Sequence, residues 1–171
     1  MPYCFYPLLQ PRPVLDFPQL PEPPQQPPAP DVFPAILVTV ALGYPSFKTV
    51  ALYSLSGKPV VLYFWASWDQ PSRKANAEMK ILLDKAVKLK PVVYAIGLES
   101  YKEPWEDAIR MDGLQNWINV TDYLNLYSSA KSLFNIPDAL PYFILLDKDM
   151  MIRFKGTNFD ALASEINRLG K

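Results

Sequence analysis

Apolar residues from residue 35 onwards recur in continuous runs and in helical spacings, which predicts alternating strands and helices. Four runs predict strands in the first half of this region, at 35–42, 47–52, 59–66 and 91–98. The first two runs flank a Gly-Tyr-Pro-Ser turn and predict a β-hairpin. A helix is expected to begin near Pro71, because apolar residues then recur at spacings of three and four, at Ala75, Met79, Leu82, Leu83, Ala86 and Leu89.

The pattern after residue 100 predicts shorter elements. Helices are expected at 104–111, at 128–134 with Ser128 as the N-cap, and at 158–169. Strands are expected at 117–120, 142–146 and 151–154, the last two joined by a turn at 147–150. Strands that alternate with helices in this order predict an α/β fold, in which a mixed β-sheet has helices on both faces.

Residues 1–34 follow a different pattern and form a separate arm. Twelve of the 19 prolines of the chain lie in this segment, which excludes a helix or a central strand and predicts an extended, polyproline-II-like chain. The first half of the arm is apolar, unlike a solvating linker, which favours an interaction arm over a spacer. Nothing in the sequence has the ~18 uninterrupted apolar residues of a membrane-spanning helix. Residues 35–171 form the folded domain.

Composition then excludes several kinds of chemistry. Lys and Arg total 17 and Asp and Glu total 17, so there is no surplus positive charge for nucleic-acid binding. The chain has no histidine, which excludes Ser-His-Asp catalytic triads, Cys-His catalytic pairs and His-ligated metal sites. Its single cysteine, Cys4, allows neither an intrachain disulfide nor a Cys-x-x-Cys pair. No metal or other cofactor is expected.

Three stretches of the domain resemble one known family. They are, in chain order, the segment Leu55-Ser-Gly-Lys-Pro-Val-Val-Leu-Tyr-Phe-Trp-Ala-Ser-Trp68, the acid Glu99 after a buried strand, and the pair Leu140-Pro141 before a strand that ends in Asp-Lys-Asp. They resemble the thioredoxin-like proteins of the TlpA/ResA type, thiol-disulfide oxidoreductases. The resemblance implies a thioredoxin-like fold for residues 35–171, a cis-proline at Pro141, and a location in the periplasm or outside the cell.

The dithiol of that family is missing from this chain. Where the family has Cys-x-x-Cys, the sequence reads Asp69-Gln70-Pro71-Ser72. Disulfide exchange needs one thiolate to attack a sulfur and a second thiol to resolve the mixed disulfide, and neither Asp69 nor Ser72 can do so. The sequence therefore predicts a redox-inactive thioredoxin-like domain that serves as a protein-binding or scaffolding module.

Asp69 and Ser72 are expected at the N-terminus of the helix that follows. The favoured interpretation is structural, with Asp69 as a helix cap and Ser72 exposed. The alternative makes Asp69 a recognition residue, or pairs it with Glu99 as a general acid and base in an unrelated enzyme. Trp65 is expected in the core.

A groove beside the cis-proline is the second candidate site. In this fold it binds an extended peptide by strand addition, which needs no cysteine. Its apolar walls would here be Trp68, Leu140, Pro141 and Tyr142, with Gln70 and Glu99 nearby. The resemblance therefore leaves open an extracytoplasmic protein with a chaperone-like groove, and a partner could also dock on residues 1–34. Met150 stands where the family's turn has Gly, and because Met is strained at positive φ, a different turn is expected there.

Overall fold

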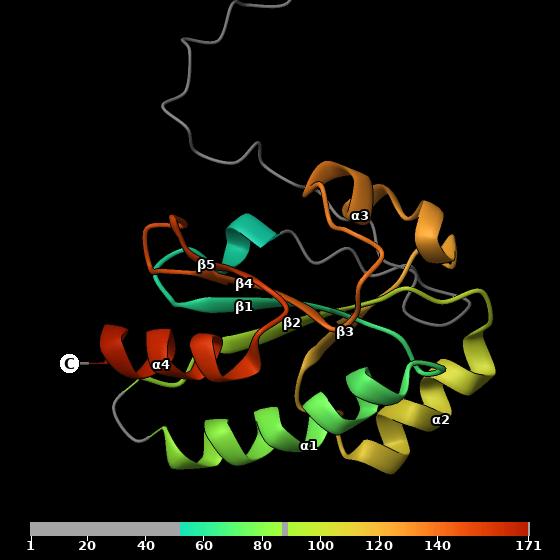
Figure 1. The fold of residues 1–171 in the computed structure, drawn as a ribbon, viewed down its shortest axis with the longest axis horizontal. Coiled ribbons are helices and arrows are strands. Elements are labelled where there is room, and N and C mark those ends of the chain that lie inside the picture. Colours follow the sequence, from blue (N-terminus) through green and yellow to red (C-terminus); the bar gives the residue numbers. More distant parts are fainter. Residues whose placement is uncertain (1–51, 87–88, 171) are drawn as a thin grey trace, which may run out of the picture. The chain divides into compact units, whose positions relative to one another are not determined.

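The computed structural model describes residues 52–86 and 89–170, which form a single five-stranded sheet covered by helices (Figure 1). The strand order is β3-β2-β1-β4-β5. Strand β2 is parallel to its neighbours β1 and β3, whereas β4 is antiparallel to β1 and to β5. The strands are β1 (Val60–Trp65), β2 (Val92–Gly97), β3 (Ile118–Val120), β4 (Tyr142–Leu146) and β5 (Ile152–Gly156). The predicted arm at 1–34 and nearly all of the predicted hairpin lie outside the described residues.

Helices cover both faces of the sheet, as predicted. Three α-helices pack on one face, and the short α3 lies on the opposite face (Figure 1). The α-helices are α1 (Gln70–Lys85), α2 (Lys102–Asp112), α3 (Ser129–Leu133) and α4 (Phe159–Leu169), and two 3-10 helices are η1 (Leu52–Leu55) and η2 (Asn125–Tyr127). Among the described helices, none combines the length and the hydropathy that a bilayer span requires.

The continuous apolar run of β1 is explained by its central position. All six of its residues are fully buried, because alternate side chains enter the two cores on either side of the sheet. Val61, Tyr63 and Trp65 pack toward α1, α2 and α4, and the intervening residues pack toward Leu52, Phe134 and Met150. Trp65 is thus a core residue, as predicted.

Most element ends agree with the predicted bounds to within one or two residues, and the larger differences are at the end of α1 and at Leu52. Helix α1 ends at Lys85, so Ala86 is its C-cap and Leu89 lies beyond it. Because the residue before a proline avoids helical conformation, Pro91 limits how far a helix can run in this stretch. Leu52 begins the 3-10 helix η1 and is not the end of a strand. The helix bounds at the C-terminus agree with the prediction, with Asn158 as the N-cap of α4.

The prediction for the turn at Met150 was wrong. Met150 has φ 63°, so the turn keeps the left-handed position despite the side chain. Two contacts hold it there: the Asp147 carboxylate accepts hydrogen bonds from the amides of Asp149 and Met151, each at 2.9 Å. The Met150 side chain is also buried in the core. Local hydrogen bonds and apolar burial therefore offset the backbone strain.

The N-terminus of α3 is capped by Asp122 and not by the residue at the N-cap position. Ser128 occupies the N-cap position, as predicted, but its hydroxyl donates to Oδ2 of Asp122 at 2.9 Å and makes no cap hydrogen bond. The same Asp122 oxygen accepts from the Ser129 amide at 3.0 Å. The free amide at the start of the helix is thus satisfied by the carboxylate and not by the serine.

Candidate functional site

The start of α1 is the place where the family dithiol would stand. Asp69 is the N-cap of this helix, in an extended conformation, and its carboxylate accepts a hydrogen bond from the Ser72 amide at 2.8 Å. Pro71 occupies the first turn, where its missing amide costs nothing. The favoured interpretation of Asp69 as a helix cap is thus confirmed.

Ser72 is buried, and the prediction that it is exposed was wrong. Its first-turn position places it on the side of α1 that faces the sheet, together with Ala75, Asn76 and Met79. The Ser72 hydroxyl lies 3.4 Å from the Ala66 amide, from which it accepts a hydrogen bond, and its carbonyl lies 2.8 Å from the Tyr63 hydroxyl. The two motif positions therefore differ, because position 69 is partly exposed and position 72 is not.

Glu99 lies just after β2 and is almost completely buried, with 2 % exposure. Its two carboxylate oxygens accept from the backbone amide and from the hydroxyl of Ser67, the latter at 2.9 Å. Burial raises the pKa of Glu99 above its ordinary value, although the Ser67 hydrogen bonds and the nearby Arg73 charge oppose this shift. The site thus holds a carboxylate that lacks a paired cation within the described part of the chain.

An open pocket of about 490 Å³ lies over Glu99. Its walls are aromatic: Trp68 is 55 % exposed and Tyr101 is 73 % exposed. The Trp68 indole nitrogen donates to the Leu98 carbonyl at 3.2 Å, which fixes the ring while leaving more than half of the side chain open to solvent. The lining residues are Ser67, Trp68, Glu99, Ser100, Tyr101, Pro104, Asn125 and Leu126.

The predicted site residues fall into two groups. Trp68 and Glu99 line this pocket together, whereas Asp69, Gln70, Leu140, Pro141 and Tyr142 are not among its lining residues.

Within the second group, the peptide bond between Leu140 and Pro141 is cis, as the resemblance implied. The side chains of Leu140 and Tyr142 are half-buried against the core on the α3 face of the sheet. Peptide binding beside Pro141 stays a prediction.

Sequence reasoning missed the pocket residues that come from distant loops. Tyr101, Asn125 and Leu126 carry no motif, and their position follows only from the way β2 and β3 lie side by side. One contact draws the loops together: the Asn125 amide donates to the Glu99 carbonyl at 3.0 Å. A tyrosine two residues after an acid at a strand end, Tyr101 after Glu99, was the available signal.

A hydrogen-bonded network connects the start of α1 to the end of α2. Arg73 donates two hydrogen bonds to the Asp112 carboxylate, which also accepts from Asn76 at 2.7 Å. Arg73 further reaches the Ser67 carbonyl at 3.4 Å. The Tyr63 hydroxyl lies 2.8 Å from Oδ1 of Asn76. The network thus fixes α1 against α2, and through Ser67 it is linked to Glu99.

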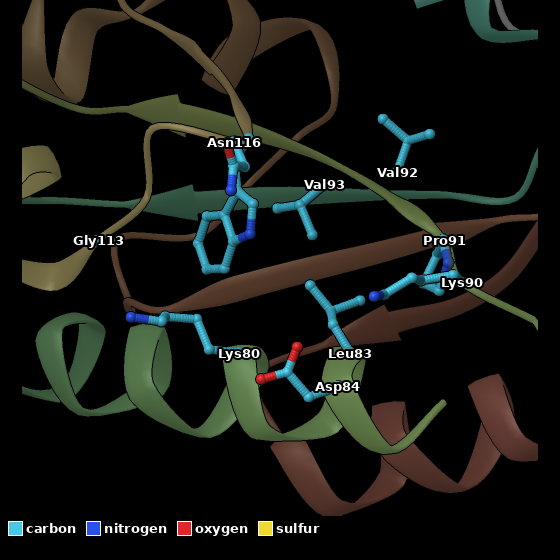
Figure 2. A pocket seen from close by; sticks show the side chains of 10 residues that line it. Lys80, Leu83, Asp84, Lys90, Pro91, Val92, Val93, Gly113 and Asn116 are labelled. Atoms are coloured by element: carbon cyan, nitrogen blue, oxygen red, sulfur yellow. The ribbon is translucent and has the colours of Figure 1, made fainter. Parts of the chain in front are cut away.

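A second pocket, of about 410 Å³, lies beside the C-terminal half of α1 (Figure 2). Figure 2 shows Lys80, Leu83 and Asp84 of α1 facing Lys90 and Val93 across it. The Lys80 ammonium donates to the Asp112 carbonyl at 2.7 Å, so this lysine secures the end of α2. Both signs of charge lie on the pocket walls, and no one ligand chemistry is favoured there.

Gly97 is expected to be intolerant of a larger residue, because the side chains of Trp105 and Glu99 close over it. A Cβ atom at this position would lie 2.6 Å from the Trp105 indole nitrogen and 3.3 Å from Cγ of Glu99. Trp105 is 2 % exposed and has little room to move. Gly97→Ala is expected to lower the free energy of unfolding by about 1–3 kcal/mol, as overpacked cores do. Urea unfolding followed by tryptophan fluorescence measures this.

Gly57→Ala is the matched control, because it adds the same methyl group at a glycine that has no close neighbours. No atom lies within 4 Å of a Cβ at Gly57, although its φ of 90° makes any side chain strained. Only the Gly97 variant is expected to change the near-ultraviolet spectrum of the packed tryptophans. An unaltered spectrum and unaltered stability for Gly97→Ala would contradict the close packing of Trp105 against Gly97.

Comparison with known proteins gives the family of this fold. The sequence model described as thioredoxin-like matches residues 57–152. No curated protein sequence matches the chain. A thiol-disulfide oxidoreductase from Bacteroides fragilis is 31 % identical, with a TM-score of 0.64 over 72 % of this chain and 90 % of that one.

More distant structures share the fold. The thioredoxin domain of a thiol-disulfide oxidoreductase from Bacteroides vulgatus is 23 % identical, with a TM-score of 0.67 over 82 % of this chain and 96 % of that one. A secreted disulfide oxidoreductase from Mycobacterium tuberculosis is 18 % identical, with a TM-score of 0.59 over 72 % and 90 % of the two chains. With the mixed sheet, the cis-proline and the capped helix already described, these matches show that the chain belongs to the thioredoxin-like family.

Proposed function

We propose that this thioredoxin-like domain binds polypeptide without exchanging disulfides, as a protein-binding or scaffolding module. One observation carries the proposal: the Asp69 carboxylate, at the position of the family's first cysteine, is hydrogen-bonded to the Ser72 amide as a helix cap. Neither motif position holds sulfur, and Cys4 is the only cysteine in the sequence. Thiolate attack and resolution at these positions have no chemical basis.

The exposed aromatic side chains support binding. Trp68 and Tyr101 present apolar surface to solvent over one pocket, and large aromatic residues of this kind dominate the energetics of protein interfaces. Their rings lie at the same end of β1 and β2 as the helix cap. A partner that contacts this end of the sheet would need no cysteine in the domain.

Two other functions are less well supported by the geometry. A chaperone-like groove at Leu140, Pro141 and Tyr142 remains compatible with the cis peptide bond and would be an extension of the same binding role. An enzyme that uses Asp69 and Glu99 as acid and base would need both groups at one pocket. The pocket over Glu99 does not include Asp69 among its lining residues, and Asp69 is engaged by the helix.

An extracytoplasmic location is part of the proposal. It is supported by the resemblance to TlpA/ResA proteins and by the fold shared with a secreted disulfide oxidoreductase. Detection of the tagged chain in the periplasmic or secreted fraction of its native source is the expected result. Recovery only with cytoplasmic markers would contradict this part of the proposal and leave the binding role standing.

Binding is tested with a polypeptide that cannot take part in thiol chemistry. An unfolded protein with every cysteine carboxymethylated is titrated into the full chain; the Trp68 indole signal of the natural chain is followed by NMR, and the affinities of all variants are measured by isothermal titration calorimetry. We expect a saturable shift, with Trp68→Ala weakening the affinity by about tenfold or more. Tyr53→Ala is the matched control, because Tyr53 is a 64 % exposed aromatic residue outside the pocket. Absence of any saturable shift would overturn the proposed function.

A further inference from the structure

The pocket over Glu99 has aromatic walls and an acidic floor. Trp68 and Tyr101 are its exposed aromatic residues, and Pro104 and Leu126 complete its apolar lining. The Glu99 carboxylate lines the same pocket, although the residue is only 2 % exposed. Aromatic faces beside a carboxylate form the chemical environment that attracts organic cations, because the ring faces are electronegative and the carboxylate is charged.

The charge of Glu99 is not neutralised within the described residues. Its oxygens accept only from Ser67, which is neutral. Arg73 is the basic group whose charge acts on Glu99, and its guanidinium is bound by two hydrogen bonds to Asp112. Glu103 and Glu106 of the adjacent α2 join Glu99 in raising the pKa of Tyr123, alongside the larger effect of its burial, and Glu106 is paired with Lys102. A basic group entering the pocket would therefore meet complementary charge.

One acceptor among the pocket residues, the side-chain oxygen of Asn125, lacks a donor. Oδ1 of Asn125 is buried and has no hydrogen-bond partner, whereas its Nδ2 donates to the Ser100 hydroxyl at 3.0 Å. The backbone presents this side chain in a strained conformation, because Asn125 has φ 52° and Tyr123 has φ 56°. Strain in residues other than glycine is typical of functional sites, and a buried unpaired acceptor is costly.

We propose that this pocket receives a basic side chain, lysine or arginine, from the partner polypeptide, with Trp68 and Tyr101 packing against its alkyl stem and Glu99 pairing with its charge. The unpaired oxygen of Asn125 accepts one of its N–H groups. This inference rests on the proposed polypeptide-binding function and adds the chemistry of the partner. The Glu99 carboxylate lacks a paired cation and the Asn125 oxygen lacks a donor, and an anionic or purely apolar side chain would supply neither.

The test uses capped five-residue peptides of alanine with a central lysine, arginine or norleucine. They are titrated into the full-length chain, and the indole N–H signal of Trp68 is followed by NMR, with Trp68→Phe to assign it. The lysine and arginine peptides are expected to bind at least about tenfold more tightly than the norleucine peptide, which matches lysine in its stem but carries no charge. Whichever of the two binds more tightly identifies the preferred head group.

Glu99→Gln and Glu103→Gln form a matched pair of variants. Both remove one negative charge, but only Glu99 lines the pocket, and Glu103 is exposed on α2. Glu99→Gln is expected to reduce the preference for lysine over norleucine at least about tenfold, and Glu103→Gln by less than about twofold. Because Gln still accepts from the Ser67 amide, the fold is retained, which the amide spectrum verifies. Tyr101→Ala, at an exposed position, is a second variant that should weaken all binding.

Two outcomes would overturn the inference. Equal binding of the lysine and norleucine peptides would exclude a cation pocket, and equal effects of the two glutamine variants would assign the preference to general surface charge. If the carboxymethylated polypeptide binds but the short peptides show no preference for lysine or arginine over norleucine, the inference fails and the proposed function stands. If neither that polypeptide nor any peptide binds, both fail together.

Discussion

Asp69→Cys with Ser72→Cys is expected to turn the chain into a thiol-disulfide oxidoreductase. The positions provide what the reaction needs: residue 69 is partly exposed at a helix N-terminus and residue 72 is buried beside it. The helix dipole and the free amides would stabilise a thiolate at residue 69. After oxidation the variant should lose two hydrogen atoms in mass, and it should accelerate the reduction of insulin by dithiothreitol at least about tenfold over the natural chain.

The single variant Asp69→Cys is the matched control. It carries the attacking thiol but cannot resolve a mixed disulfide, so it should accumulate mixed disulfide and show little turnover. Loss of the Asp69 cap lowers the stability of both variants by about 0.5–2 kcal/mol, which leaves them comparable with each other. If the double variant forms no internal disulfide, residues 69 and 72 do not have the geometry of the family dithiol.

Asp112→Ala is expected to be the most damaging substitution in the network that joins α1 to α2. The Asp112 carboxylate accepts from both Arg73 and the fully buried Asn76, so its removal leaves donors of both residues unpaired. The side chains of Arg73 and Asp112 are 30 % and 18 % exposed, which moderates the loss. We expect the free energy of unfolding to fall by about 3 kcal/mol, as measured by urea unfolding.

The same carboxylate should make stability depend on acid pH. Burial raises the pKa of Asp112, but the hydrogen bonds from Arg73 and Asn76, with the charges of Arg73 and Lys80, lower it by more, so it lies below its ordinary value. In the unfolded chain this group binds protons near its ordinary pKa of about 3.9. The contribution of the Asp112 carboxylate to the free energy of unfolding is therefore fully present above that pH. It is lost as the pH falls through the lower pKa of the folded state.

Asp112→Asn separates the charge from the shape of the side chain. The difference in unfolding free energy between the natural chain and this variant should be largest near pH ~7 and should shrink toward pH ~3. Asp147, whose pKa is also lowered despite its burial, keeps its own contribution in both proteins and so cancels in the comparison. A difference that grows at acid pH would contradict the assigned ionisation of Asp112.

The order of elements in the described domain was predictable from sequence, because buried strands and amphipathic helices leave strong patterns. The six residues of β1 are all apolar because both faces of the central strand are covered. The turn at Met150 was not predictable in the same way. Its left-handed conformation depends on the Asp147 carboxylate and on a core that receives the Met150 side chain, and both are features of the folded state.

The candidate site was predictable only in part. The cap at Asp69 follows from local chemistry, since an acid before a proline-containing first turn is a common helix start. The burial of Ser72 depends on which side of α1 meets the sheet. Its polar hydroxyl alone suggested an exposed position. The pocket joins Trp68 after β1, Tyr101 after β2 and Asn125 after β3. Such contacts between loops distant in sequence arise from the sheet topology, and no local pattern encodes them.

The most direct test of the central claim is the rate at which the natural chain reduces insulin in the presence of dithiothreitol. The claim is that a thioredoxin-like frame here carries Asp69 and Ser72 in place of the dithiol and retains no exchange chemistry. The expected rate equals that of dithiothreitol alone, at chain concentrations where Asp69→Cys with Ser72→Cys is active. A rate above that background for the natural chain would contradict the account.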